Sequence, residues 1–194
     1  MRLILASTSP RRADLLRESG ISFRVEPPQV EEWSAEEFPE IQPGELARGN
    51  ARRKARAVAE RQPGQPILAA DTIVVCEGRV LGKPADEEVA RQMLGWLSGR
   101  VHEVVTAVVL LLPDGKKIRE SVVRTRVKFR ELSSAEVEAY VREIDVLDKA
   151  GAYALQDGGD RLVERVEGSR SNVIGLPMET VLPWCEELVA AAGA

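Results

Sequence analysis

Residues 3–20 read LILASTSPRRADLLRESG, and this stretch decides the expected fold class. The apolar run at residues 3–6 is typical of a short buried strand. Ser9 and Pro10 fit the N-cap and the first position of a helix, and Gly20 fits the residue that ends it. A strand, a tight loop and a helix in this order indicate an α/β fold.

The composition excludes several broad classes of protein. The chain has 194 residues, of which 44% are apolar and 30% charged, so it can close one globular core. A net charge of −4 argues against a nucleic-acid polymer as partner, because binding a phosphate backbone needs a basic excess. Cys76 and Cys185 have no CxxC spacing, and His102 is the single histidine, which argues against a disulfide scaffold or structural zinc. The apolar run at residues 3–6 is too short for a signal peptide or membrane span, so we expect a cytoplasmic protein.

Periodicity and turn residues predict most of the other elements. The small and apolar residues of a helix over 43–61 fall on one face, and Lys54 lies on that inward stripe. Glu77-Gly78 fits a hairpin turn. We find no repeat or domain boundary and expect a single domain over residues 1–194. The remaining expected elements are an acidic, proline-rich surface loop over 26–45, strand segments at 67–70 and 73–75 interrupted by 71–72, a helix over 86–98, strands over 101–112 and 117–129 joined at 113–115, a helix over 133–144 that opens with a capping box, a strand near 162–166 and a closing helix that contains Trp184 and Leu188.

Arg11 and Arg12 occupy the first turn of the first predicted helix, where positive charge is locally unfavourable. An anion held by the free N–H groups, the nearby serine hydroxyls and the guanidinium groups would reverse this penalty. The motif therefore predicts an anion site. The pair taken alone also fits two solvated arginines on a surface helix.

Asp71 lies inside the apolar stretch ILAADTIVV. Burying an ionised carboxylate is costly unless it meets a cation or several donors, so a catalytic or metal-binding role fits. An aspartate that ends a strand by binding backbone N–H groups fits as well. Lys54 and Lys83 could each reach a triphosphate, although either also fits an ordinary snorkelling or loop lysine. Without a histidine cluster, a metal site would depend on carboxylates such as Asp71 and Glu32, which suit Mg²⁺ or Mn²⁺.

Several common catalytic signatures are missing from the sequence. It contains neither GxxxxGK[ST] nor GxGxxG, which argues against P-loop and dinucleotide-binding enzymes. It also lacks a Ser/His/Asp signature, and His102 near the start of an apolar strand fits a structural hydrogen bond better than acyl transfer.

Five motifs follow one another along the chain: LILASTSPRR, ADTIVV with LGKP, SGRVHEVVTAV, DKAGAYALQ and EGSRSNVIGLP. In this order they closely resemble the Maf family of nucleotide pyrophosphatases, and the resemblance extends from Leu3 to about Val181. It implies an α/β fold with a mixed elongated sheet and flanking helices, in two lobes around a deep cleft, similar to inosine-triphosphate pyrophosphatases. It also implies a homodimer that uses Mg²⁺, Mn²⁺ or Co²⁺ to cleave a nucleoside triphosphate between its α and β phosphates.

The resemblance also assigns roles to individual residues. Asp71 is similar to the proton acceptor that activates water, and Glu32 resembles a carboxylate of the acidic loop that helps to hold the metal together with Asp71. The residues that resemble the clamp on the triphosphate are Ser7, Arg11, Arg12, Lys54 and Lys83. Such a set fits catalysis by positioning and charge neutralisation.

The segment DKAGAY followed by Gln156 is similar to the subgroup that acts on dTTP and UTP. A glutamine amide presents a donor beside an acceptor, which matches the N3–H and adjacent carbonyl of thymine or uracil. Arg11 and Thr72 resemble the other two specificity positions, while a loop glutamine bonded to backbone is the simpler alternative for Gln156. Two other functions remain open: a non-enzymatic nucleotide-binding regulator of septum formation, and a pyrophosphatase for deaminated purine nucleotides.

Two positions depart from the family pattern. Arg53 stands where an acid commonly precedes the lysine, which would alter affinity if that acid orients Lys54 or a metal. Arg170 replaces a common aromatic residue, and it either contacts phosphate or lies outside the cleft.

Overall fold

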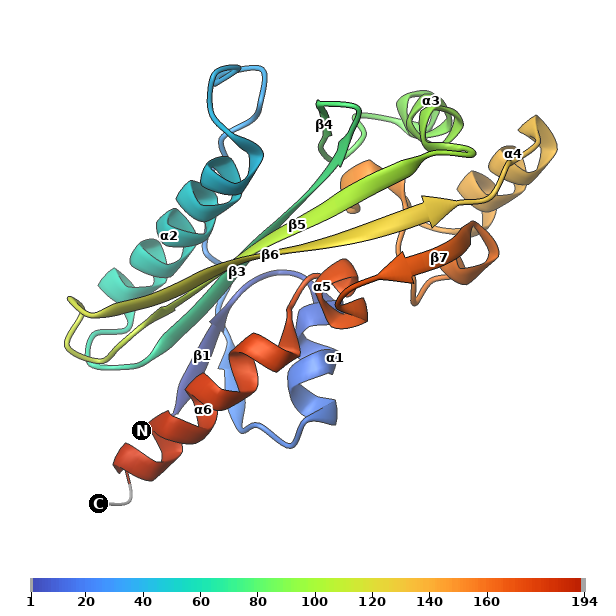
Figure 1. The fold of residues 1–194 in the computed structure, drawn as a ribbon. Helices are drawn as coiled ribbons and strands as arrows, with labels where there is room; N and C mark the ends of the chain where they lie inside the picture. The colour runs from blue at the N-terminus through green and yellow to red at the C-terminus, as the bar shows by residue number, and fades with distance from the viewer. Residues whose placement is uncertain (1, 193–194) are drawn as a thin grey trace. The chain divides into compact units, whose positions relative to one another are not determined.

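The computed structural model describes residues 2–192 and contains a seven-stranded sheet with flanking helices (Figure 1). Six strands follow the order β2-β1-β3-β5-β6-β7, and β4 pairs with β3. The strands are β1 (Leu3–Ala6), β2 (Phe23–Val25), β3 (Ile67–Cys76), β4 (Arg79–Leu81), β5 (Val101–Leu111), β6 (Ile118–Phe129) and β7 (Val163–Glu167). The helices are α1 (Pro10–Glu18), α2 (Pro43–Arg61), α3 (Glu87–Leu97), α4 (Ser134–Glu143), α5 (Arg170–Ile174) and α6 (Met178–Ala192), with 3₁₀ turns η1 (Ala150–Ala152) and η2 (Gly159–Arg161). The predicted mixed α/β class is confirmed.

The chain forms two compact units. Unit 1 contains the residues up to Asp71, Thr106–Val123, and the residues from Gly175 onward. Unit 2 contains Thr72–Val105 and Arg124–Ile174. The strands β3, β5 and β6 therefore contribute residues to both units, and Asp71 is the last residue of β3 that belongs to unit 1.

Unit 1 is built on parallel strands. β1 pairs in parallel with both β2 and β3, with Leu5 opposite Val25 on one side and Leu68 on the other. Parallel strands carry apolar side chains on both faces and need cover on each. The inward face of α2 provides part of this cover, since Ala47 and Val58 are fully buried and the helix contacts β1. The predicted bounds of α2 and its apolar stripe are confirmed.

Unit 2 is built on antiparallel pairs and has its own core. β3 turns into β4 through Glu77 and Gly78, both with positive φ (50° and 79°), as a two-residue hairpin of the primed type requires. β6 pairs antiparallel with β7. The core side chains of this unit come from β3, β5, β6, α3 and α4, and Phe129 and Tyr140 are its largest fully buried members.

The structure confirms the predicted caps and turns and joins two strand segments into one strand. Ser133 and Glu136 form the predicted capping box, and Asp114 accepts the N–H groups that close the turn between β5 and β6. β3 runs unbroken from Ile67 to Cys76, so residues 71–72 interrupt the apolar pattern but not the strand itself. A carboxylate can sit within this strand because side chains from α2 bind it, as described below.

Two short elements were not predicted. β2 has three residues, and two of them are exposed, so it shows no apolar pattern. α5 has five residues, fewer than two helical turns, which is too short for a periodicity to appear. Short segments of this kind are fixed by their pairing and packing partners rather than by their own sequence.

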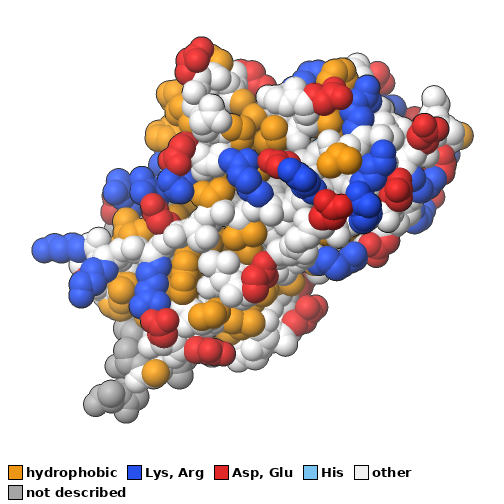
Figure 2. Space-filling model, in the orientation of Figure 1, with side chains coloured by type: hydrophobic (Ala, Val, Ile, Leu, Met, Phe, Trp, Pro, Cys, Tyr) orange, Lys and Arg blue, Asp and Glu red, His pale blue; other side chains and the backbone are white. Residues whose placement is uncertain are grey.

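Charged side chains of both signs alternate on the face that Figure 2 displays. Ion pairs among residues 2–192 include Arg91 with Glu138 (Nε to Oε2, 2.6 Å) and Arg52 with Glu120 (Nη2 to Oε1, 2.7 Å). Among residues 2–192, no helix combines the length and the apolar character that crossing a membrane requires.

Candidate active site

A buried ion pair in unit 1 lies at the centre of the site. Lys54 of α2 is 4% exposed and Asp71 of β3 is 5% exposed, and Nζ lies 2.6 Å from Oδ1. The same ammonium lies 2.6 Å from Oε1 of Glu32 and donates to Ala70 O at 3.5 Å. Lys54 thus meets three acceptors, the full capacity of an ammonium group. Asp71 is buried at a tolerable cost because a cation meets it directly.

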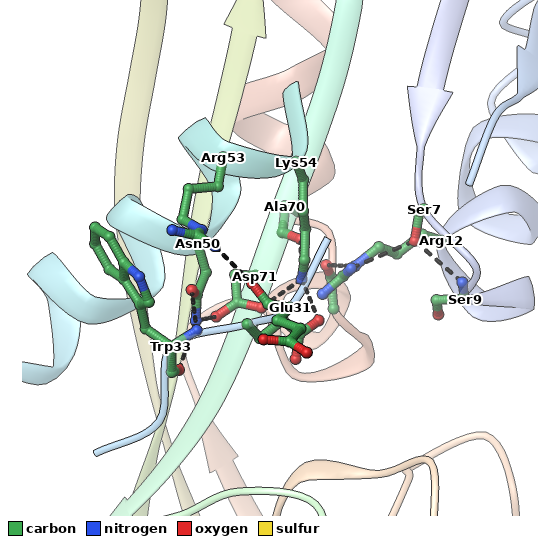
Figure 3. Close-up of polar contacts among 12 residues, drawn as sticks. Ser7, Ser9, Arg12, Glu31, Trp33, Asn50, Arg53, Lys54, Ala70 and Asp71 are labelled. Carbon is green, nitrogen blue, oxygen red and sulfur yellow. Dashed lines mark hydrogen bonds and ion pairs between the residues drawn. The ribbon is translucent and has the colours of Figure 1, made fainter. Parts of the chain in front are cut away.

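The second oxygen of Asp71 has a different partner. Asn50 Nδ2 donates to Oδ2 at 3.3 Å, and Asn50 is itself 3% exposed (Figure 3). Asn50 precedes Lys54 by one helical turn, so both side chains leave the same face of α2. The sequence analysis did not identify Asn50. Its signal was a polar residue on the inward stripe of the helix, in line with Lys54.

Arg12 and Ser7 form the part of the site that belongs to α1. Arg12 Nε donates to Gly175 O at 2.8 Å, and Nη1 donates to Ser7 Oγ at 3.4 Å. Burial lowers the pKa of the Arg12 guanidinium, whereas the negative charges of Asp71 and Glu32 raise it. Figure 3 shows the Arg12 side chain pointing toward the Lys54–Asp71 pair.

The start of α1 has the predicted form. Ser9 is the N-cap and Pro10 the first helical residue, and Ser7 Oγ accepts the N–H of Ser9 at 3.1 Å. Arg11 shares the first turn with Arg12 and contributes to lowering the pKa of Arg12. The structure therefore brings together the predicted residues Ser7, Arg12, Glu32, Lys54 and Asp71, and Arg11 adjoins Arg12 in the first turn of α1.

The acidic loop is attached to α2 at Trp33. Asn50 Oδ1 accepts the N–H of Trp33 at 2.8 Å, and its Nδ2 donates to Trp33 O at 3.0 Å. The Arg53 guanidinium lies 4.9 Å from the centre of a Trp33 ring, and Nη2 donates to Glu31 O at 3.2 Å. Arg53, one of the two departures from the family pattern, therefore holds the loop that carries Glu32. Side chains of α2 thus contact this loop at Glu31 and Trp33.

The donor set suits a hard divalent cation bound together with substrate. Glu32 and Asp71 present carboxylate oxygens to the same ammonium, so their charges converge on one place. Among residues 2–192 no group of three or more His, Cys, Asp or Glu side chains is arranged to hold a metal. Mg²⁺ commonly uses one or two carboxylates together with substrate phosphates and water, rather than a cage made only of protein ligands. Two converging carboxylates fit that mode of binding.

The other predicted site residues belong to unit 2. Lys83 is exposed in the loop after β4, and Gln156 is exposed in the segment after η1. Thr72 follows Asp71 on β3 and is half-buried, and neighbouring strand residues point to opposite faces. Arg170, the second departure, forms an exposed ion pair with Asp160 (Nη2 to Oδ1, 3.0 Å).

Buried polar contacts hold the segment that carries Gln156. Lys149, which is 5% exposed, donates to Asp145 O and lies 2.7 Å from Asp148 Oδ1 and 3.4 Å from Asp157 Oδ2. One ammonium thus joins the two ends of the segment. The sequence analysis included Lys149 in a motif but assigned it no role.

His102 has the structural role that its place in an apolar strand predicted. Its Nε2 lies 2.8 Å from the hydroxyl of Tyr153, and both residues pack against Phe129 in edge-to-face contacts. Burial lowers the pKa of His102 to about 4 and raises the pKa of Tyr153. Both groups are therefore neutral near pH 7, and their hydrogen bond fixes Tyr153 beside η1.

Comparison with known proteins finds relatives along nearly the whole chain. The family model described as "Maf-like protein" matches residues 2–188. The chain is 49% identical over 193 residues to a protein of Myxococcus xanthus, covering 94% of this chain and 95% of that one. It is 46% identical over 180 residues to a protein of Akkermansia muciniphila, covering 93% of each chain. Both relatives are named dTTP/UTP pyrophosphatase. On the strength of a match along nearly its whole length, this chain belongs to the Maf family.

Proposed function

We propose that this chain hydrolyses dTTP and UTP to the nucleoside monophosphate and pyrophosphate. One observation carries the proposal: a buried carboxylate, Asp71, is held between an ammonium and an amide beside the arginine-bearing turn of α1. The names of the relatives from Myxococcus xanthus and Akkermansia muciniphila supply the nucleotide class.

In the proposed reaction, Asp71 accepts a proton from a water molecule as the water oxygen attacks the α-phosphorus. The bond to the bridging oxygen breaks, and pyrophosphate leaves with the electron pair. Negative charge grows on the phosphate oxygens during this step, and donors already in place stabilise it most. The cationic donors of unit 1 are Arg11, Arg12 and Lys54, and Ser7 adds a hydroxyl. The motif resemblance assigns a triphosphate contact to Lys83 as well.

Lys54 can bind a triphosphate only by giving up one of its three acceptors. Of the two carboxylates, Glu32 is the more easily displaced, because its side chain is 37% exposed and lies on the acidic loop, whereas that of Asp71 is 7% exposed. Displacement would let the Glu32 carboxylate turn to a cation. Arrival of the substrate would in this way redistribute charges that are already paired, without exposing Asp71.

Glu32 and Asp71 would hold a divalent cation, Mg²⁺, Mn²⁺ or Co²⁺, through their oxygens. The cation would supply positive charge against the phosphate oxygens. Gln156, with Arg11 and Thr72, would select the pyrimidine base, through an amide that offers one donor and one acceptor. We also propose that the chain acts as a homodimer in the cytoplasm, which light scattering on the purified protein and cell fractionation would test.

A substrate panel tests the proposal directly. Purified protein with Mg²⁺ is expected to release pyrophosphate faster from dTTP and UTP than from CTP, GTP, ITP or XTP. The Asp71→Asn variant is expected to bind nucleotide but to lose turnover. Triphosphates that bind and survive intact would favour a non-enzymatic regulator, and faster cleavage of ITP or XTP would favour a role on deaminated purines. Parental turnover in Asp71→Asn would refute the assignment of the base.

A further inference from the structure

Asn50 uses both N–H donors of its amide and accepts one hydrogen bond at its carbonyl oxygen. Its carbonyl oxygen accepts the Trp33 N–H at 2.8 Å, and its nitrogen donates to Trp33 O at 3.0 Å and to Asp71 Oδ2 at 3.3 Å (Figure 3). An asparagine amide has two N–H donors, and both are used here. The Trp33 N–H requires an acceptor, which fixes the amide orientation and leaves a donor facing Asp71.

Two neighbours on α2 hold the same loop by contacts that do not involve Asp71. Arg53 stacks on Trp33 and donates to Glu31 O. Gly49 leaves space for the indole, since a Cβ atom at this position would lie 2.5 Å from Trp33 Cζ3. Asn50 differs from both because its contacts join the loop to the carboxylate. The structure thus offers a matched pair of side chains, Asn50 and Arg53, for separating these two effects.

The two oxygens of Asp71 are held from different directions. Lys54 binds Oδ1 and Asn50 binds Oδ2, so the plane of the carboxylate is fixed by two side chains on one face of α2. The Asn50 side chain binds the backbone N–H and C=O of Trp33. Trp33 follows Glu32 in the chain, and Glu32 contacts the same Lys54 ammonium as Asp71 does. The Asn50 amide therefore contacts both the loop and the carboxylate of Asp71.

We propose that Asn50 is a positioning residue that aligns Asp71 for activation of water, while its contacts with the Trp33 backbone fix the orientation of its amide. The inference rests on the proposed function, because it takes Asp71 as the base. A donor lost from a charged acceptor costs enough to slow turnover by about 10- to 100-fold. Substrate contacts stay in place, so the effect belongs in kcat rather than in KM.

The test measures kcat and KM for UTP in Asn50→Ala, Asn50→Asp and Arg53→Ala. We expect kcat to fall at least about 10-fold in both Asn50 variants, with the KM of Asn50→Ala changed less than about threefold. Asn50→Asp keeps the size of the side chain and an acceptor for Trp33 but replaces the donor to Asp71 with a second carboxyl group, so its kcat alone serves as the readout if the alanine variant does not fold. Arg53→Ala loosens the loop and leaves the Asn50–Asp71 contact, and its kcat should fall less than about threefold.

Fluorescence of Trp33, in a background of Trp96→Phe and Trp184→Phe, reports whether the loop is seated. We expect Asn50→Ala and Arg53→Ala both to shift this emission, while only the Asn50 variant loses most of its kcat. Equal losses of kcat in the two variants, or an Asn50→Ala kcat within about twofold of the parent, would overturn the inference.

A double substitution separates this inference from the proposed function. If Asn50 acts through Asp71, Asn50→Ala should change the residual turnover of Asp71→Asn by less than about twofold. A further tenfold loss would show that Asn50 acts elsewhere. Parental turnover in Asp71→Asn alone would remove the proposed base, whereas loss in Asp71→Asn with normal turnover in Asn50→Ala would remove only the positioning role.

Discussion

Replacing Lys54 by methionine should destabilise the protein strongly, because it leaves the buried Asp71 carboxylate without its ammonium partner. Breaking a buried ion pair from one side typically costs about 3–5 kcal/mol of unfolding free energy. The lower end applies here, since Asn50 still donates to Oδ2 and the charge of Arg12 still acts on Asp71. Glu32 adds little to the cost, because its side chain is 37% exposed and can be hydrated.

The expected loss is therefore about 3 kcal/mol, measured by urea unfolding at pH 7.5. For a chain of this length it corresponds to a fall of roughly 6–12 °C in the melting midpoint. The control is Lys54→Met combined with Asp71→Asn. The neutral amide can still accept a hydrogen bond from Asn50 and no longer needs a counter-charge, so the double variant should recover at least about half of the loss.

Two results would refute this reasoning. A loss below about 1 kcal/mol in Lys54→Met would mean that the pair behaves as an exposed salt bridge does, despite its burial. No recovery in the double variant would mean that the damage comes from packing of the lysine stem rather than from the stranded carboxylate.

Three further predictions concern other parts of the chain. Burial lowers the pKa of His102 to about 4, so the unfolded chain binds more protons than the folded chain between pH 6.5 and 4. The free energy of unfolding should therefore decrease by about 3 kcal/mol as the pH is lowered across this window. His102→Gln should flatten that dependence in unfolding curves, and an unchanged slope would contradict it. Gly49→Ala should displace the Trp33 indole and shift its fluorescence emission. In a Trp33→Ala background, where the clash is absent, the same substitution should instead stabilise the helix by about 1 kcal/mol. An equal change in unfolding free energy in both backgrounds would be inconsistent with the clash. Lys149→Met should increase proteolytic cleavage between residues 145 and 157, since one ammonium joins both ends of this segment, and cleavage at the parental rate would argue against that role.

Local signals were enough to predict most helices and strands. Ser9-Pro10 at the start of α1, the Ser133–Glu136 capping box of α4 and the Glu77-Gly78 turn each follow from backbone or hydrogen-bonding properties of a few neighbouring residues. β2 could not be predicted in this way, because its three residues become a strand only through pairing with β1. The unbroken course of β3 through Asp71 likewise depends on partners from another part of the chain.

The site shows the same division between local and long-range information. The inward placement of Lys54 follows from helical periodicity, and the cost of burying a charge predicted a cation or several donors for Asp71 without identifying Lys54 as its partner. The role of Asn50 could not be predicted from local sequence, because its partners Trp33 and Asp71 are 17 and 21 positions away. Arg53 appeared only as a departure from a pattern, and its contact with Trp33 explains how this chain uses the position.

The charges of unit 1 indicate how the proposed metal ion would contribute to binding. Arg11, Arg12 and Lys54 oppose Glu32 and Asp71, which leaves one net positive charge, and a divalent ion raises it to three. A nucleoside triphosphate carries roughly four negative charges near neutral pH, and a monophosphate about two. Without the metal, the charges of the site therefore neutralise a much smaller share of the triphosphate charge than of the monophosphate charge. Chelation of the metal should weaken binding of a non-hydrolysable UTP analogue by at least about tenfold and that of UMP much less, as measured by calorimetry with and without EDTA. Equal weakening of both ligands would mean that the metal acts on the fold of the site, rather than by balancing the charge of the phosphate chain.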